Sequence, residues 1–292
     1  MARPVVISHR GASGYRPENT LEAFQLGISQ GADGLEFDLV NTKDQKLIIR
    51  HENALSKTTN ISSKPEFQHL RRVGEVAGEE LSDWFSEDLT LQEVKSLRAI
   101  ERVPEVRPGS ALFDNQFSVP TFSDLLNSEF ITGKVLVVEL KEGTHLKVLD
   151  QTIGALAAQD ILNSNIQDLD VKLIIESFSY EILLNAKSQI QNLGLKASYF
   201  LALEKTSLEL LDLEELASEV VGIAISLDML FSSDDWVKSA HDAGLLIWVY
   251  TARAERARTS VEAYYEEIIQ TGVDGIFADQ PDLLIRVLAD RG

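Results

Sequence analysis

The chain alternates short apolar runs with longer amphipathic segments, and this alternation limits its fold more than any other feature. The predicted strands are residues 5–9, 34–40, 47–51, 135–140, 173–178, 197–202, 222–227, 245–250 and 274–279. Segments with helical periodicity lie between most of them, at 20–30, 145–162, 179–193, 206–219, 232–243 and 255–271. Because strands that alternate with helices usually pair in parallel, we expect a mostly parallel α/β sheet.

Nine strands are one more than a barrel of eight requires. Residues 41–46 are too few for a parallel crossover, so the strands at 34–40 and 47–51 suit an antiparallel hairpin. Without the hairpin strand, eight βα units remain, which predicts a (β/α)₈ TIM barrel that uses the whole chain, 1–292, as one domain. A turn centred near 43–45 would bring His51 roughly opposite Glu36 or Asp38.

Residues 52–133 break this rhythm, because they contain no clear central strand and are too many for an ordinary loop. The segment follows the hairpin at the C-terminal face of the barrel, where the active sites of such barrels lie. We therefore expect an inserted subdomain that covers this face.

The composition excludes several classes of protein. A formal net charge of −19 argues against nucleic-acid binding, and the absence of cysteine removes disulfides and thiolate chemistry. No apolar stretch is long enough to span a membrane. No secretory signal precedes the first strand, so we expect a cytoplasmic protein, or a periplasmic one if a leader has been trimmed.

Three carboxylates are candidate metal ligands. Glu36 and Asp38 alternate with apolar residues and so point to the same side of one strand, and Glu139 lies near the C-terminal end of another. Carboxylates in apolar strands are costly unless they are paired or bind a metal. An all-oxygen site suits Mg²⁺ or Ca²⁺ better than zinc. The alternative is that Glu139 forms only a structural ion pair with Lys141.

His9 and His51 end two of the predicted strands and are the natural acid–base pair, because imidazole titrates near neutral pH. Arg10 and Lys141 are cations among these acids and would bind phosphate oxygens or only balance charge. Trp248 would form a wall of the substrate site or a barrel-core aromatic.

These residues resemble the glycerophosphodiester phosphodiesterase family. The resemblance is carried by HRGASGYRPENTLEAF at 9–24, LEFDLV at 35–40, VELK at 138–141, IWVYTARAE at 247–255 and GVDGIFADQPD at 272–282. The segment EELSDWFSEDLTLQEVKSL at 79–97 resembles the longer bacterial branch of that family. The likeness therefore runs over nearly the whole chain.

The resemblance implies a phosphoric diester hydrolase that uses one divalent cation, with Ca²⁺ favoured and Mg²⁺ as the alternative. It implies hydrolysis of a small glycerophosphodiester, such as glycerophosphocholine or glycerophosphoethanolamine, to sn-glycerol 3-phosphate and an alcohol. By position, Glu36, Asp38 and Glu139 match the metal ligands and His9 and His51 the acid–base pair. Residues near the phosphate are matched by Arg10 and Lys141, and an acidic position near the site by Glu18.

Two departures and two alternatives accompany this interpretation. Glu52 follows the second histidine where the family usually has Asp, and Ala278 stands where it often has Thr. A larger lipid phosphodiester, as in a lysophospholipase D-like activity, is one alternative substrate. A non-catalytic barrel that binds phosphodiesters is the other alternative.

Overall fold

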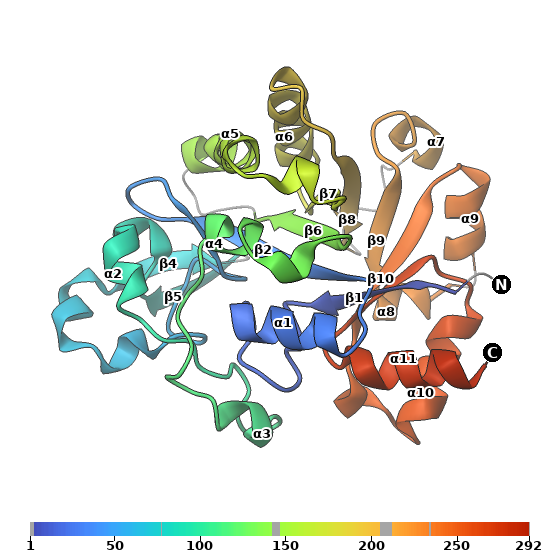
Figure 1. Cartoon of the computed structure of the whole chain (residues 1–292), viewed down its shortest axis with the longest axis horizontal. Helices are drawn as coiled ribbons and strands as arrows, with labels where there is room; N and C mark the ends of the chain where they lie inside the picture. The colour runs from blue at the N-terminus through green and yellow to red at the C-terminus, as the bar shows by residue number, and fades with distance from the viewer. Residues whose placement is uncertain (1–2, 77, 142–146, 205–211, 234, 292) are drawn as a thin grey trace.

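A computed structural model describes residues 3–76, 78–141, 147–204, 212–233 and 235–291. Eight parallel strands follow one another in the order β1-β11-β10-β9-β8-β7-β6-β2, and β2 pairs with β1 to close a barrel (Figure 1). The strands are β1 (Val5–His9), β2 (Gly34–Asn41), β6 (Val135–Leu140), β7 (Lys172–Ser177), β8 (Ser198–Leu203), β9 (Gly222–Ser226), β10 (Leu246–Ala252) and β11 (Gly275–Ala278). The predicted TIM barrel is confirmed.

The ninth predicted strand, β3 (Leu47–Ile49), is antiparallel to β2 and lies outside the closed ring. Leu39 pairs with Ile49, and the backbone N–H of Arg50 donates to the carbonyl of Asp38 at 3.0 Å. The predicted hairpin is therefore confirmed, and it directs the residues after β3 toward the side chains of β2.

Helices flank the barrel, as Figure 1 shows. They are α1 (Leu21–Ser29), α5 (Lys147–Asn163), α6 (Tyr180–Asn192), α7 (Leu213–Leu216), α8 (Leu227–Leu230), α9 (Trp236–Asp242), α10 (Val261–Gln270) and α11 (Pro281–Asp290). The predicted helix at 255–271 begins late, because Ser260 accepts a hydrogen bond from the N–H of Ala263 and so caps α10. The expected helices at 145–162 and 206–219 lie partly outside the described residues.

The helix predicted at 232–243 begins only at Trp236. A separate short helix, α8, precedes it directly after β9. Ser226 ends that strand and caps α8 by accepting a hydrogen bond from the N–H of Met229. The cap therefore starts a helix earlier than the pattern of apolar residues indicated.

Apolar side chains fill the barrel interior and form its floor. Phe200, Trp248 and Phe277 belong to one buried cluster, in which the Trp248 ring lies 4.8 Å from that of Phe200 and 5.6 Å from that of Phe277. Gly275 gives the indole its room, since a Cβ there would lie 2.6 Å from the Trp248 ring. Functional side chains are thereby left to the C-terminal ends of the strands.

Residues 52–133 form a two-stranded sheet and short helices beside the barrel (Figure 1). The elements are β4 (Arg72–Val76), β5 (Glu79–Asp83), α2 (Leu91–Lys95), α3 (Pro108–Ala111) and α4 (Phe122–Leu126), with 3₁₀ turns at Asn60–Ser63, Pro65–Leu70, Ser86–Asp88 and Glu129–Ile131. Much of the segment packs around a second apolar cluster, which includes Phe67 and Trp84 together with Val40 and Ile48 of the hairpin. Helix α4 instead buries Phe122 and Leu125 in the main apolar cluster, which the strands and the flanking helices share.

Candidate active site

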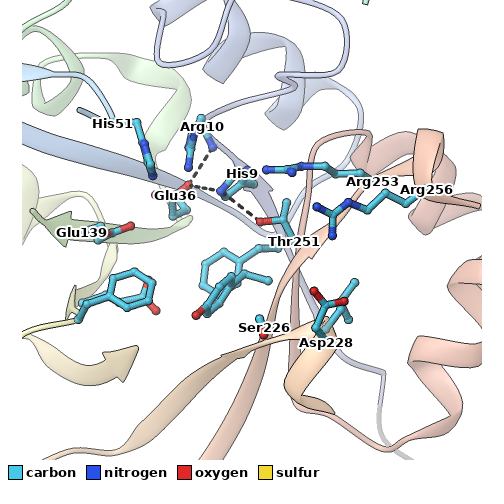
Figure 2. A pocket seen from close by; sticks show the side chains of 15 residues that line it. His9, Arg10, Glu36, His51, Glu139, Ser226, Asp228, Thr251, Arg253 and Arg256 are labelled. Carbon is cyan, nitrogen blue, oxygen red and sulfur yellow. Dashed lines mark hydrogen bonds and ion pairs between the residues drawn. The ribbon is translucent and has the colours of Figure 1, made fainter. Parts of the chain in front are cut away.

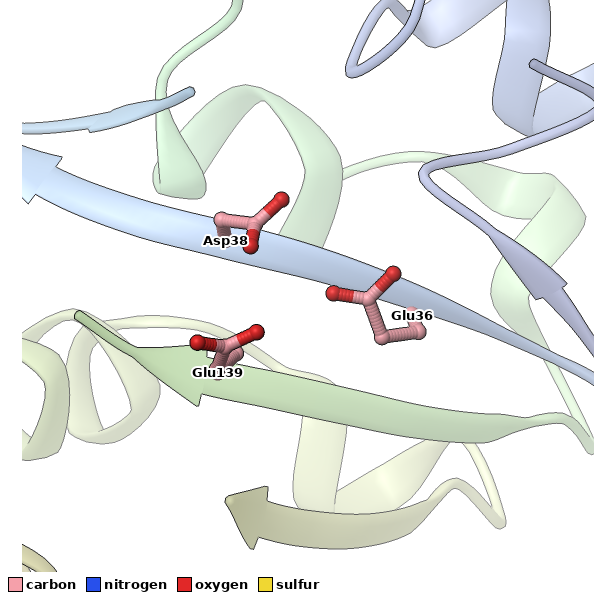
Figure 3. A group of neighbouring side chains, drawn as sticks. All are labelled: Glu36, Asp38 and Glu139. Carbon is pink, nitrogen blue, oxygen red and sulfur yellow. The ribbon is translucent and has the colours of Figure 1, made fainter. Parts of the chain in front are cut away.

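Three carboxylates lie side by side in Figure 3: Glu36 and Asp38 on β2, and Glu139 near the C-terminal end of β6. The parallel register pairs Asp38 with Glu139, and one carboxylate oxygen from each of the three residues lies within 4.8 Å of the others. All three side chains are buried. Alternation along β2 therefore brings together the carboxylates that the sequence indicated.

Burial and mutual repulsion disfavour ionisation of two of the three carboxylates, Glu36 and Glu139. Burial, and then the charge of Asp38, raise the pKa of Glu36 well above its usual value. Burial likewise raises the pKa of Glu139 to about 7. Among the described residues, Glu36 Oε1 and Asp38 Oδ1 are buried and have no hydrogen-bond donor. Unsatisfied oxygens on converging carboxylates fit the ligand set of a hard divalent cation.

His9 ends β1 and lies next to the carboxylates. Its Nδ1 is 2.6 Å from Oδ1 of Asp279, and its Nε2 is 3.8 Å from Glu36 and 3.5 Å from Thr251 Oγ1. Burial and the charge of Arg10 lower the pKa of His9, although Asp279 opposes them. A neutral ring whose Nδ1–H donates to Asp279 leaves Nε2 free to exchange a proton.

His51 follows β3 and approaches the carboxylates from the other strand of the hairpin. Its Nδ1 is 2.7 Å from Oε1 of Glu52, and its Nε2 is 4.0 Å from Oδ1 of Asp38. Burial, then Arg10 and Lys141, lower the pKa of His51 to about 4. The longer side chain of Glu52 thus still reaches the histidine, which also keeps Nε2 facing the site.

Arg10 and Lys141 are placed among the acids, as the sequence indicated. Arg10 has a left-handed backbone (φ 54°), and its N–H donates to Glu36 at 2.9 Å. Its guanidinium lies 3.4 Å from Asp38. Lys141 Nζ lies 2.6 Å from Glu139 and 3.5 Å from Asp38. Both cations therefore offset the negative charge of the cluster, and Arg10 also lines the pocket described next.

A pocket of about 290 Å³ contains both histidines (Figure 2). Its other lining residues are Arg10, Glu36, Glu139, Glu176, Phe178, Ser226, Leu227, Asp228, Tyr250, Thr251, Arg253, Arg256 and Phe277. In Figure 2, His51 and Glu139 lie at one end, and Asp228 and Arg256 lie at the other. Trp248 is not among these residues, because it is buried in the barrel interior; Tyr250, two positions later, lines the pocket instead.

Several residues of the site were missed or left without a role at the level of the sequence. Asn19, in the PENT motif, donates to Oδ2 of Asp38 at 2.8 Å, and Glu18 pairs with Arg10. Asp279 follows the last barrel strand, and Glu176 lies near the end of β7. A polar residue at the C-terminal end of a barrel strand is the signal that could have indicated both.

The sequence matches the model of the glycerophosphoryl diester phosphodiesterase family over residues 9–283. A glycerophosphodiester phosphodiesterase of Bacillus subtilis is 28% identical over 288 residues, which cover 98% of this chain and 86% of the relative. Another, of Arabidopsis thaliana, is 26% identical over 319 residues, which cover 95% of this chain and 84% of the relative.

Solved structures share the barrel. An Oleispira antarctica phosphodiesterase in complex with the product sn-glycerol-3-phosphate matches with a TM-score of 0.74 and 22% identity, over 98% of this chain and 97% of that one. A glycerophosphodiester phosphodiesterase from Agrobacterium tumefaciens matches with a TM-score of 0.64 and 22% identity, over 97% and 99%.

Together, these matches and the site define a phosphoric diester hydrolase. More narrowly, the chain belongs to the glycerophosphoryl diester phosphodiesterase family, which confirms the resemblance drawn from the motifs. Within the part of the chain that the structure describes, no helix has the length and apolar character needed to cross a membrane.

Proposed function

We propose that the chain hydrolyses small glycerophosphodiesters, such as glycerophosphocholine or glycerophosphoethanolamine, to sn-glycerol 3-phosphate and an alcohol. The observation that carries this proposal is the placement of two histidines, each with its Nε2 directed toward a buried carboxylate cluster, on either side of that cluster. Within one pocket they can serve one substrate from two sides.

Glu36, Asp38 and Glu139 are proposed to hold one divalent cation, with Ca²⁺ favoured and Mg²⁺ as the alternative. When bound, the cation would supply positive charge to offset that of the substrate phosphate. The oxygens of Glu36 and Asp38 that lack a donor support this assignment. An overall charge of −19 would otherwise repel an anionic substrate.

In the proposed reaction, Nε2 of one histidine takes the proton of the glycerol hydroxyl next to the phosphate, and that oxygen attacks phosphorus. The bond from phosphorus to the alcohol breaks, and the other histidine, in its protonated form, gives its proton to the departing oxygen. Water then opens the cyclic phosphodiester with the two roles exchanged. Arg10 lies where it would bind a phosphate oxygen, and Lys141 holds Glu139 and Asp38 in place.

The pocket also bears on the choice between a soluble and a lipid substrate. A volume of about 290 Å³ suits a small molecule, and charged side chains such as Asp228, Arg253 and Arg256 line it. Arg102 and Arg107, from the segment 52–133, line an adjoining cavity of about 220 Å³. These charges favour a polar head group over an acyl chain. The segment 52–133 is proposed to cover this side of the site.

The test is release of glycerol 3-phosphate from glycerophosphocholine by the metal-stripped protein, before and after Ca²⁺ or Mg²⁺ is added, with His9→Ala and His51→Ala alongside. We expect metal-dependent release that each substitution lowers by at least about 10²-fold. Turnover of lysophosphatidylcholine alone would favour the lipid substrate. Full activity of both histidine variants would overturn the acid–base assignment.

A further inference from the structure

The two histidines are held in the same way, although they come from different strands. In each case Nδ1 meets a carboxylate, at 2.6 Å for His9 with Asp279 and at 2.7 Å for His51 with Glu52. Each of these carboxylates is in turn bound by an arginine that the barrel does not supply. Arg102 binds Glu52, and an ion pair joins Arg107 to Asp279.

Arg102 makes a bidentate contact with Glu52. Its Nη1 and Nη2 donate to Oε1 and Oε2 of Glu52, both at 2.7 Å. The same guanidinium donates to Glu18 from Nε at 2.9 Å and from Nη2 at 2.6 Å. A planar guanidinium that bridges two carboxylates restricts both, so the Glu52 side chain is held in one orientation.

Arg107 contacts Asp279 in a comparable way on the other side. Its Nη2 pairs with Oδ2, to which Arg253 Nε also donates at 3.0 Å, and Oδ1 remains for His9. The guanidinium is itself fixed, because Nε donates to Glu255 at 2.9 Å and Nη1 donates to the carbonyl of Ser13 at 3.1 Å. Asp279 therefore presents one oxygen to two arginines, Arg107 and Arg253, and the other to the histidine.

Both arginines come from one short turn of the segment 52–133. The turn is fixed internally, because the N–H of Glu101 donates to Asp114 at 2.7 Å and the N–H of Val103 donates to the Glu101 carboxylate at 3.0 Å. The N–H of Arg107 closes it by donating to the carbonyl of Val103 at 2.9 Å. A turn held in this way sets the spacing between the two guanidinium groups.

We propose that Arg102 and Arg107 are positioning residues, through which one turn outside the barrel orients both histidines by way of Glu52 and Asp279. The departure from Asp to Glu at position 52 fits this role. Glu has one more rotatable bond than Asp, and Arg102 removes that freedom. The proposal rests on the proposed function, because it assumes that both histidines act in the reaction.

The kinetic test compares Arg102→Gln and Arg107→Gln with Arg98→Gln, a matched control from the same segment whose guanidinium donates to the backbone carbonyls of Lys95 and Leu97. With glycerophosphocholine and metal present, we expect kcat to fall roughly 10- to 100-fold for each positioning variant, with KM within about 2-fold. Arg98→Gln should keep wild-type kcat. Arg102→Lys keeps the charge but loses the bidentate contact, so its kcat should lie between those of wild type and Arg102→Gln.

A double-mutant comparison separates positioning from general loosening of the fold. If Arg102 acts through Glu52, Arg102→Gln should lower kcat no further in a Glu52→Gln background. In an Asp279→Asn background, by contrast, the two reductions in kcat should multiply. Long-range ¹H–¹⁵N spectra of the histidine rings give a readout independent of turnover. They should show the Nδ1–H form in the wild type and a mixture of tautomers for His51 in Arg102→Gln.

The outcomes separate the positioning role from the proposed function. The positioning role would be overturned by wild-type kcat in both positioning variants. It would also be overturned if Arg102→Gln lowered kcat equally in the wild-type and Glu52→Gln backgrounds. In either case, inactive histidine variants would leave the proposed function standing. Active His9→Ala and His51→Ala variants would instead remove the proposed acid–base mechanism. If Arg102→Gln fails to fold, Arg102→Lys is measured in its place, by turnover and by the ring spectra. An unchanged His51 tautomer together with an unchanged kcat in Arg102→Lys would overturn the proposal.

Discussion

Nδ1 of His9 lies 2.6 Å from Oδ1 of Asp279, although 270 positions separate the two residues along the chain. Closure of the barrel brings them together, since β1 and β11 are neighbours and Ser8 pairs with Ala278. The residues that follow, at the C-terminal ends of these two strands, therefore face each other across the seam.

The first prediction concerns this pair. Asp279→Asn should lower kcat by about 10²- to 10⁴-fold with little change in KM, because an amide can present its NH₂ group to Nδ1 and stabilise the wrong tautomer. Steady-state release of glycerol 3-phosphate measures the effect. Asp242→Asn, which removes an exposed carboxylate of α9, is the control and should behave as wild type. An Asp279→Asn enzyme with wild-type kcat would contradict the orienting role of Asp279.

The second prediction concerns the metal. Ca²⁺ at about 100 times its Kd should stabilise the native protein by about 2.7 kcal/mol, visible as a rise in Tm. Glu36→Gln should abolish that rise without lowering the Tm of the metal-free protein, since a neutral side chain relieves repulsion from Asp38 and Glu139. Asp170→Asn, an exposed change far from the cluster in sequence, should keep the full response. A persistent Ca²⁺-induced rise in Glu36→Gln would exclude Glu36 as a ligand.

The third prediction concerns pH and Glu18. Burial opposes ionisation of Glu18, but Arg102 and Arg10 outweigh it and lower its pKa from 4.5 to about 2. A carboxyl whose pKa is lower in the folded state contributes stability above its unfolded pKa, and this contribution is lost as the pH falls through the folded pKa. Glu18→Gln should therefore lower the free energy of unfolding by about 3 kcal/mol at neutral pH, and the difference from wild type should shrink between about pH 4.5 and pH 2.

Urea unfolding across this pH range measures the difference, with Glu105→Gln as a control that removes an exposed carboxylate from the same region. The control should follow wild type throughout. A difference between Glu18→Gln and wild type that stays constant with pH would show that the loss comes from packing and not from the charge of Glu18.

The fourth prediction concerns Trp248. Because its ring fills the barrel interior against Phe200 and Phe277, Trp248→Phe should lower the free energy of unfolding by about 1 to 3 kcal/mol. Well below the Tm, kcat/KM should stay within about 2-fold of wild type. A tenfold rise in KM with unchanged stability would instead support contact between Trp248 and the substrate.

Much of the fold was predictable because its signals are local. The spacing of apolar runs predicted the eight barrel strands, and the six residues between the hairpin strands predicted their antiparallel pairing. The alternation of Glu36 and Asp38 predicted that both would point the same way. Helix ends were less predictable: Ser260 shifted the start of the helix expected at 255–271, and Ser226 capped a separate short helix, α8, before the one expected at 232–243.

The sequence by itself determined the barrel, the three carboxylates and the two histidines, since each of these follows from periodicity or from a motif within a short stretch. Only the tertiary structure decided what orients the histidines. Asp279 reaches His9 through closure of the barrel, and Arg102 reaches Glu52 from a turn fifty residues further along the chain. Such contacts leave no periodic trace in the sequence, because they depend on how separate elements pack in space and not on the spacing of residues along any one of them.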